Sequence, residues 1–233
     1  MSSIFEIALQ EVQPGMVLGL GSGRASLAFV RALGSRVSQG LEVRGVPTSD
    51  QTSALALQLG IPLVSLAELG SRTIDLTVDG ADEVDPELNL IKGYGRALVR
   101  EKIIATSSKR VVILVGTEKL VNSLGDRGRL PVEVVAFGLP LLLKKLEEWG
   151  SPGVVWEGPS GQNLSDNGNP IVDCATKGIE DLAALARKIR NLPGVVDTGF
   201  FEGLADRVLV GDENRGFEFC QSLDRGPTQI SGS

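Results

Sequence analysis

Histidine is absent from this chain of 233 residues. Catalytic triads with a histidine base and metal cages built from histidine are therefore excluded. Acid–base chemistry in this protein must be carried by Asp, Glu, Lys, Tyr or Cys. Cysteine is scarce too: Cys174 and Cys220 lie far apart and match neither metal-ligand nor redox spacing, so we interpret them as ordinary thiols and expect no metal site.

Long apolar runs and clusters of basic residues are also missing. Residues 1–10 include an acidic one and no apolar block of signal-peptide length, and the apolar stretch 111–115 is too short to span a bilayer. The net charge is −6, and no run of Lys or Arg offers a face to nucleic acid or to an anionic membrane. We therefore expect a soluble cytoplasmic protein with neither nucleic acid nor membrane as a partner, in which an anionic substrate must be captured locally.

What the chain does have is 42% hydrophobic residues, enough for a core, in short strands and helices that alternate. Apolar stretches predict strands at residues 16–20, 41–46, 60–63, 74–78 and 111–115. Helices are predicted at residues 4–13, 25–33, 51–59 and 66–70. This alternation is typical of an α/β fold with a parallel sheet covered on both faces.

The pattern changes at Leu130. Residues 132–136, 153–156, 171–175 and 195–200 read as strands and residues 139–149 and 179–189 as helices, in the order strand, helix, strand, strand, helix, strand. That order is ferredoxin-like and predicts a second, small α+β domain inserted into the first. We assign residues 1–129 and 206–221 to the main domain, 130–205 to the inserted domain and 222–233 to a flexible tail. A strand at 207–211 returns to the main sheet, and Asp-Asn-Gly-Asn at 166–169 predicts a tight hairpin turn.

The first predicted strand leads into a glycine-rich loop, Gly-Leu-Gly-Ser-Gly at residues 19–23, which a helix follows. The backbone N–H groups and dipole of such a helix start favour an anion such as a phosphate. Arg24 supports this interpretation, since a guanidinium can hold two phosphate oxygens. Two alternatives stay open. One is a tight turn that merely needs glycine; the other is a dinucleotide site, which would want glycine at position 24 and an acidic residue at the end of the next strand, whereas Glu42 lies near its start.

Three carboxylates and a lysine follow within residues 74–102. Asp79 and Asp82 come directly after a predicted strand, Lys92 opens a Lys-Gly-Tyr-Gly loop, and Glu101 lies on the next helix. Proton abstraction beside a carbonyl needs such a set: a base for carbon, acids for oxygens and a cation for developing charge. Because ligands bind beyond the carboxyl ends of parallel strands, we expect these groups and the glycine loop to face one crevice. Alternatively, the aspartates only form turns by accepting hydrogen bonds from their own backbone.

Glu101 is the sharpest of these candidates. Helical spacing places four apolar residues at offsets of three and four from it: Ala97, Leu98, Ile104 and Ala105. A carboxylate in an apolar sector is costly, and desolvation raises its basicity, so its presence there indicates a function. The alternative is a plain surface helix on which Glu101 pairs with Lys92, Arg96 or Arg100.

Short ordered motifs run through nearly the whole chain. They are Gly-Leu-Gly-Ser-Gly (19–23), Gly-Val-Pro-Thr-Ser (45–49), Asp-Gly-Ala-Asp-Glu (79–83), Leu-Ile-Lys-Gly (90–93), Arg-Glu-Lys-Ile (100–103), Leu-Pro-Val-Glu-Val (130–134), Asp-Asn-Gly-Asn (166–169), Pro-Gly-Val-Val (193–196) and Thr-Gly-Phe (198–200). Together they resemble the type A ribose-5-phosphate isomerase family. The resemblance implies a Rossmann-like domain with an inserted ferredoxin-like domain, a homodimer, and interconversion of ribose 5-phosphate and ribulose 5-phosphate without metal or cofactor, in the non-oxidative branch of the pentose phosphate pathway.

The resemblance also implies roles for individual residues. Glu101 corresponds to the catalytic base that moves a proton between C1 and C2 through an enediolate. Asp79, Asp82 and Lys92 correspond to residues that handle oxygen protons and stabilise charge. The expected substrate contacts are Ser22, Gly23, Arg24, Ala25, Gly80, Ala81, Gly93, Tyr94, Gly95 and Lys119. Judged without the resemblance, Lys119 could equally be a solvated lysine beyond the strand at 111–115.

The sequence departs from the family pattern in three substrate loops. Where the family usually has Gly-Thr-Gly-Ser-Thr, residues 21–25 are Gly-Ser-Gly-Arg-Ala, which removes a threonine hydroxyl at Ala25 and adds the charge of Arg24. Tyr94 replaces a glycine, and it would be strained if the position demanded positive φ, while its ring could narrow the pocket. Before Lys119, the usual Asp-x-Ser-Lys reads Gly-Thr-Glu-Lys (116–119).

An isomerase is therefore the leading hypothesis, with two competitors. The altered loops could belong to a sensor that binds a sugar phosphate without turning it over. Alternatively, Glu101 beside a glycine loop could be the nucleophile of an acyl or coenzyme-A transferase, although the paired aspartates would then have no task.

Overall fold

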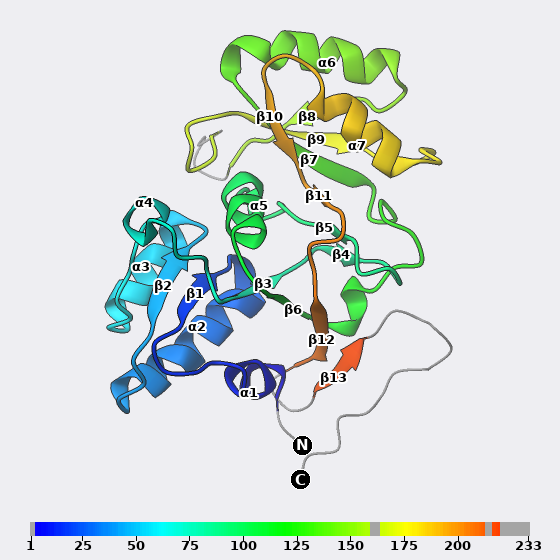
Figure 1. The fold of residues 1–233 in the computed structure, drawn as a ribbon. Coiled ribbons are helices and arrows are strands. Elements are labelled where there is room, and N and C mark those ends of the chain that lie inside the picture. Colours follow the sequence, from blue (N-terminus) through cyan, green and yellow to red (C-terminus); the bar gives the residue numbers. More distant parts are fainter. Residues whose placement is uncertain (1–2, 159–163, 213–215, 220–233) are drawn as a thin grey trace.

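A six-stranded sheet in the order β13-β12-β6-β3-β1-β2 forms the centre of the computed structural model. Its strands are β1 (Val17–Leu20), β2 (Arg44–Pro47), β3 (Leu76–Gly80), β6 (Val111–Val115), β12 (Arg207–Gly211) and β13 (Gly216–Phe219). Neighbours from β2 to β12 run parallel, and β13 pairs antiparallel with β12. All residues of β1 and β6 are buried, as expected for apolar strands of a parallel sheet that is covered on both faces. The structure describes residues 3–158, 164–212 and 216–219 (Figure 1).

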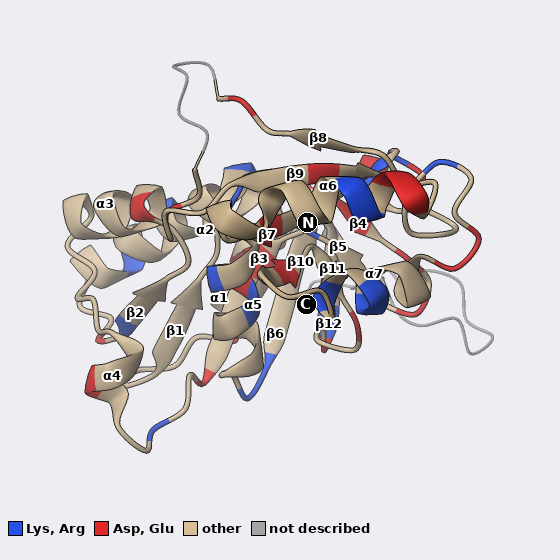
Figure 2. Cartoon of the chain, turned by 90° about the horizontal axis from the view of Figure 1, so that it is seen from above, with Lys and Arg blue, Asp and Glu red and all other residues tan. Residues whose placement is uncertain are grey.

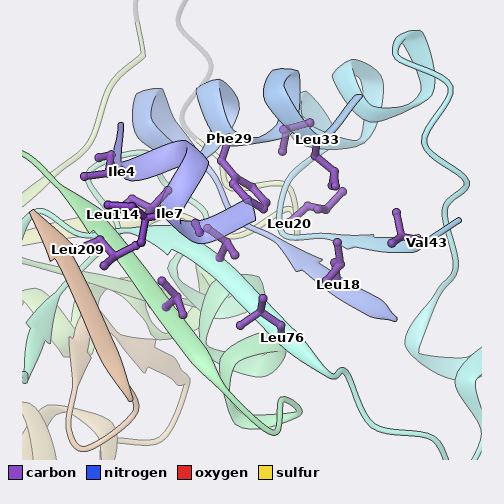
Figure 3. Packing of buried hydrophobic residues seen from close by; sticks show 14 of the residues in the cluster. Ile4, Ile7, Leu18, Leu20, Phe29, Leu33, Val43, Leu76, Leu114 and Leu209 are labelled. Atoms are coloured by element: carbon purple, nitrogen blue, oxygen red, sulfur yellow. The ribbon is translucent and has the colours of Figure 1, made fainter. Parts of the chain in front are cut away.

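Helices cover this sheet on both sides. They are α1 (Ile4–Leu9), α2 (Gly23–Ser38) and α3 (Asp50–Gln58) on one face, and α4 (Leu66–Leu69) and α5 (Leu98–Thr106) on the other. Figure 3 shows Phe29 and Leu33 of α2 beside Leu18 and Leu20 of β1, all fully buried. Burial of each such side chain contributes roughly 1.5–3 kcal/mol, so this layer anchors the glycine loop between β1 and α2.

A second, antiparallel sheet in the order β10-β7-β9-β8 forms a separate small unit, drawn above the main sheet in Figure 1. Its elements are β7 (Arg129–Val134), a 3-10 turn η2 (Ala136–Gly138), α6 (Leu139–Glu148), β8 (Gly153–Val155), β9 (Ile171–Ala175), α7 (Leu182–Arg190) and β10 (Val195–Thr198). This is the predicted ferredoxin-like order, built around its own apolar cluster, and it confirms the fold class. The boundaries of the two domains stay predictions, and residues 222–233 lie outside the described residues.

A small three-stranded sheet connects the two units and was not predicted. It consists of β11 (Phe200–Phe201), β5 (Leu90–Ile91) and β4 (Glu83–Val84). Strands of two residues carry no periodicity from which they could be recognised. The sheet nevertheless matters for the site, because β5 leads directly to Lys92.

Several predicted boundaries were wrong, for local reasons. Residues 60–63 form no strand, and Leu63 makes only an isolated bridge with Gly45. The strand predicted at 195–200 divides at Gly199, which donates its N–H to the carbonyl of Pro131. Helix α7 begins later than predicted because the Asp181 carboxylate caps it by accepting the N–H of Ala184.

Two further predictions about the chain can be compared with the structure. The tight turn at 166–169 is present, closed by the Ser165 N–H donating to the carbonyl of Asn169. Cys174 lies buried in β9 as a free thiol, and burial raises its pKa, as expected of an ordinary core cysteine. Cys220 lies outside the described residues.

No helix in the described ranges is long and apolar enough to cross a membrane. In Figure 2, acidic and basic segments alternate over both units and do not gather into a basic face in that view. This distribution agrees with the net charge of −6.

At Gly21 the glycine loop packs closely against Asp79, at the end of β3. A Cβ atom at Gly21 would lie 2.1 Å from Asp79 Oδ1 and 2.6 Å from the Asp79 Cα, so backbone would have to move. We expect Gly21→Ala to lower the free energy of unfolding by about 1–3 kcal/mol in urea titrations. Gly95→Ala, where a Cβ meets nothing within 4 Å, is the control and should change it by less than about 0.5 kcal/mol. Equal stability of the two variants would contradict this account of Gly21.

Candidate active site

One large cavity, of about 670 Å³, opens where β1, β3 and β6 end. Its lining includes nearly all the residues predicted from the sequence: Ser22, Gly23, Arg24, Ala25, Gly80, Ala81, Asp82, Lys92, Gly93, Tyr94, Gly95, Glu101 and Lys119. The expectation that the glycine loop and the loop after β3 face one crevice is therefore confirmed. Asp79 is the exception, because it lies behind the lining.

The glycine loop presents the start of α2 to this cavity. Ser22 is the N-cap residue, but its hydroxyl forms a 2.6 Å hydrogen bond with Thr48 Oγ1 and does not cap the helix. Gly23 has φ +82°, which glycine adopts without strain. The first N–H groups of α2 thus keep their capacity for an anion. Helix α3 is capped by the residue after Thr48, Ser49, whose hydroxyl accepts the N–H of Thr52.

Asp79 joins the two loops. Its Oδ1 accepts hydrogen bonds from Ser22 N–H (3.0 Å), the Ser26 hydroxyl (2.9 Å) and Gly80 N–H (2.7 Å), while Oδ2 lies 3.0 Å from Lys92 Nζ. The turn-forming alternative therefore describes part of what Asp79 does. The structure places this predicted catalytic residue as a support for Lys92 and the glycine loop. Ser26, one helical turn into α2, is a supporting residue that no local sequence pattern marks.

Lys92 lies at the centre of the charged groups. Its side chain is 4% exposed, and Nζ donates to the carbonyl of Gly80 and lies 3.4 Å from Glu101 Oε2. Burial alone would lower the pKa of this ammonium, but the charges of Asp79 and Glu101 outweigh burial and raise it. Lys92 is therefore positively charged near neutral pH.

Glu101 projects from the first turn of α5, where its side chain is 5% exposed. Burial raises the pKa of its carboxyl to about 8, with the charges of Asp79 and Asp82 adding to the shift and Lys92 opposing it. Oε2 is buried and accepts no hydrogen bond, although Lys92 is near. The plain surface helix of that alternative is thus wrong, although the pair with Lys92 is present, and Glu101 is a cavity-lining carboxyl whose raised pKa suits it to take a proton.

Asp82 faces the cavity beside these groups. Its Oδ2 accepts the backbone N–H of Tyr94 at 2.9 Å, and its Oδ1 lies 4.0 Å from Lys119 Nζ at the end of a 3-10 turn, η1 (Thr117–Lys119). Burial raises the pKa of this carboxyl, whereas the hydrogen bond from the Tyr94 N–H and the charge of Lys92 lower it by less. Asp82 is therefore a second carboxylate able to exchange protons.

The expected strain at Tyr94 is absent. Positive φ falls instead on Gly93 (+102°) and on Arg96 (+69°). The Tyr94 hydroxyl donates to the carbonyl of Arg129, and the Arg129 guanidinium lies 3.9 Å from the ring centroid. The tyrosine side chain thus reaches the small unit while its backbone stays in the cavity lining. The sequence drew attention to position 94 but named Arg96 only as a possible partner of Glu101, whereas Arg96 binds Asp173.

A metal site finds no support in the arrangement. Within the described ranges, no three Cys, Asp or Glu side chains are grouped so that they could hold a metal ion. The positive charge beside the carboxylates is the Lys92 ammonium.

A weakly acidic buried glutamate, a charged lysine and a helix N-terminus share one cavity at the carboxyl edge of a parallel sheet. These features define an α/β enzyme of acid–base chemistry on a small anionic substrate. The family model described as "Ribose 5-phosphate isomerase A (phosphoriboisomerase A)" matches residues 44–215. The chain belongs to the ribose-5-phosphate isomerase A family.

Individual relatives agree. A ribose-5-phosphate isomerase A from Roseiflexus sp. (strain RS-1) is 45% identical over 208 residues, which is 88% of each chain. The structure of ribose 5-phosphate isomerase A from Methanocaldococcus jannaschii is 38% identical, with a TM-score of 0.85 over 93% of this chain and 96% of that one. A D-ribose-5-phosphate isomerase in complex with phospho-erythronic acid is 36% identical, with a TM-score of 0.86 over 92% and 94% of the two chains.

Replacing Glu101 with Gln should stabilise the protein more at pH 8 than at pH 5. Between the ordinary value of 4.5 and the raised pKa of about 8, the folded chain holds a proton that the unfolded chain releases. The wild type therefore loses stability as the pH rises through this window, whereas a neutral Gln does not. We expect a gain of roughly 1–4 kcal/mol at pH 8 in urea unfolding.

Glu147→Gln, at an exposed position of α6, is the matched control and should show no pH-dependent gain. A gain for Glu101→Gln that is the same at both pH values would contradict the raised pKa.

Proposed function

We propose that this protein interconverts ribose 5-phosphate and ribulose 5-phosphate by acid–base catalysis through an enediolate. The observation that carries the proposal is the buried Glu101 Oε2, which accepts no hydrogen bond and lies 3.4 Å from a charged lysine. The family membership supports an isomerase, and the neighbour with bound phospho-erythronic acid supports a phosphorylated sugar as the ligand. Neither comparison supports a sensor without turnover.

In this proposal Glu101 breaks the C2–H bond of the open-chain aldose and returns the proton to C1. The electron pair left at C2 forms the enediolate, whose negative oxygen lies near the Lys92 ammonium. A pKa near 8 suits Glu101 for both halves of the transfer, since the group takes and gives up a proton easily near neutral pH. Lys92 is preorganised for this charge by Asp79 and the Gly80 carbonyl, so it need not reorient during the reaction.

We assign to Asp82 the transfer of the hydroxyl proton between O2 and O1. Asp82 lines the cavity, its pKa is raised by burial, and the Tyr94 N–H holds one of its oxygens. Asp79 does not line the cavity, so we assign it the orientation of Lys92 and of the glycine loop.

The phosphate belongs at the other part of the cavity, at the start of α2. Arg24 and the N-terminal residues of α2 line it there, and Lys119 lines the same cavity 4.0 Å from Asp82. The Arg24 guanidinium has no hydrogen bond or ion pair with any other residue that the structure describes, so it is available for an anion. The charge of Arg24 compensates for the missing threonine hydroxyl, which the family pattern has at the position of Ala25.

An acyl or coenzyme-A transferase remains the other class to exclude. It would need a carboxylate nucleophile, whereas burial and a pKa near 8 leave much of Glu101 protonated at neutral pH. Incubation with an acyl donor should leave no covalent adduct on Glu101 in a mass spectrum.

The finer assignments rest on the family resemblance in the sequence. We infer a cytoplasmic homodimer of the non-oxidative pentose phosphate pathway that needs neither metal nor organic cofactor and binds neither nucleic acid nor membranes. Light scattering of the purified protein tests the dimer.

Glu101→Gln should abolish most of the turnover of ribose 5-phosphate. Loss of a placed general base typically lowers kcat by about 10²–10⁴-fold, and KM should change little because Gln keeps the shape of the side chain. For the wild type, kcat/KM should rise with pH through about 8 as Glu101 becomes deprotonated. A variant with near-normal kcat would remove Glu101 from its role. Glu147→Gln serves again as the control and should retain wild-type kinetics.

Arg24→Ala should weaken substrate binding. A charge-assisted hydrogen bond is worth about 1.5–3 kcal/mol, so KM for ribose 5-phosphate should rise roughly 10-fold or more with a smaller change in kcat. Arg31→Ala, at an exposed position two turns along the same helix, should leave KM unchanged. If both variants bind the substrate like the wild type, Arg24 is no phosphate contact.

A further inference from the structure

The turn that follows Lys92 contains an unusual backbone conformation. The Arg96 N–H donates to the carbonyl of Gly93 at 2.9 Å and closes the turn. Arg96 has φ +69°, in the left-handed region that side chains other than glycine rarely adopt. Such a conformation costs free energy and persists only where surrounding contacts hold it. The contacts of Arg96 therefore need an explanation.

Those contacts are made to the small unit. The Arg96 guanidinium donates to both oxygens of Asp173 in β9, at 2.6 and 2.9 Å, and lies 4.9 Å from the ring centroid of Trp156. The two charged side chains are 11% and 16% exposed, so water screens them little. A two-point bond of this kind fixes direction as well as distance.

The other side of the turn is tied to the same carboxylate. Arg129 Nη1 donates to Asp173 Oδ2 at 3.3 Å, and its guanidinium lies against the Tyr94 ring. The Tyr94 hydroxyl donates to the Arg129 carbonyl at 3.2 Å. Asp173 thus holds the turn at Arg96 directly and at Tyr94 through Arg129.

The groups next to this turn are those of the proposed chemistry. Lys92 precedes it, the N–H of Tyr94 orients Asp82, and α5 with Glu101 begins directly after it. Helix α5 is itself bonded to the small unit on either side of Glu101. Arg100 donates to the Asp166 carbonyl and to Asn167, and Lys102 donates to Asp197 and to the Thr198 carbonyl.

We propose that Arg96 is a positioning residue for the isomerase reaction: its paired hydrogen bonds to Asp173 hold the turn 93–96 against the small unit, so that Lys92, Asp82 and Glu101 stay in place before substrate arrives. The inference rests on the proposed function. It assigns to the small unit a task in catalysis, which is to fix the loop and helix that carry the acid–base groups.

The test compares Arg96→Ala, Arg96→Gly and Asp173→Asn. The two Arg96 variants remove both hydrogen bonds to Asp173, and Asp173→Asn leaves at most one of them, but only Arg96→Gly also relieves the left-handed backbone. A positioning role predicts that kcat falls by a similar factor in all three, about 10–100-fold, while KM changes by less than about threefold. A merely structural role predicts that activity follows stability, so that Arg96→Gly would be the more active of the two Arg96 variants.

The pH profile gives a second readout. The charged groups that face Glu101 are Asp79, Asp82 and Lys92, and all of them remain in these variants. A loosened turn admits water to Glu101, so the midpoint of the kcat/KM profile should move down from about 8. Arg110→Ala, which removes the ion pair of an exposed arginine with Glu11 remote from the turn, should change neither kcat nor the midpoint.

The outcomes separate this inference from the proposed function. Wild-type protein without isomerase activity would overturn both. An active wild type whose kcat and pH midpoint are unchanged in the Arg96 and Asp173 variants would overturn only the positioning role. Should these variants fail to fold, Arg96→Lys, which keeps the positive charge but not the planar fork that bonds both Asp173 oxygens, must still lower kcat several-fold, and wild-type kinetics in that variant would refute the proposal.

Discussion

The site depends on the ammonium of Lys92, buried between Asp79 and Glu101. Each of these groups would be costly to bury alone, since an unpaired charge in an apolar interior loses its hydration. Together the opposite charges stabilise one another, but the two carboxylates differ in the hydrogen bonds that they accept. Asp79 receives three hydrogen bonds besides the lysine, whereas Glu101 Oε2 receives none. Asp79 is thus the better hydrogen-bonded partner of Lys92, and Glu101 is the carboxyl whose pKa burial raises.

Separate parts of the chain deliver these three residues. Asp79 comes from the end of β3, Lys92 from the loop after β5, and Glu101 from the first turn of α5. The parallel sheet fixes only the first of them. The other two lie on a segment between the units, and its cations are bonded to β9, to the turn at 166–169 and to β10. The small unit is therefore part of the structure that holds the site together.

The fold carries free-energy costs at this site. A buried carboxylate with a raised pKa and an arginine with φ +69° both work against stability. They are tolerated because large apolar clusters lie beneath the main sheet and within the small unit. Costs of this kind are common where side chains must be ready for chemistry before the substrate binds.

The sequence by itself determined the alternation of strands and helices, the ferredoxin-like insertion and the burial of Glu101, and with the family resemblance it named thirteen of the 21 residues that line the cavity. Apolar periodicity and the placement of loops after strands are local, so they can be read without a structure. Tertiary structure alone decided that Asp79 supports Lys92 from behind the lining, that Tyr94 is unstrained, and that Arg96 takes the left-handed conformation and binds Asp173. These contacts join residues up to 77 positions apart. No local pattern encodes them, because they form only when the main sheet, the loop after β5 and the small unit pack together.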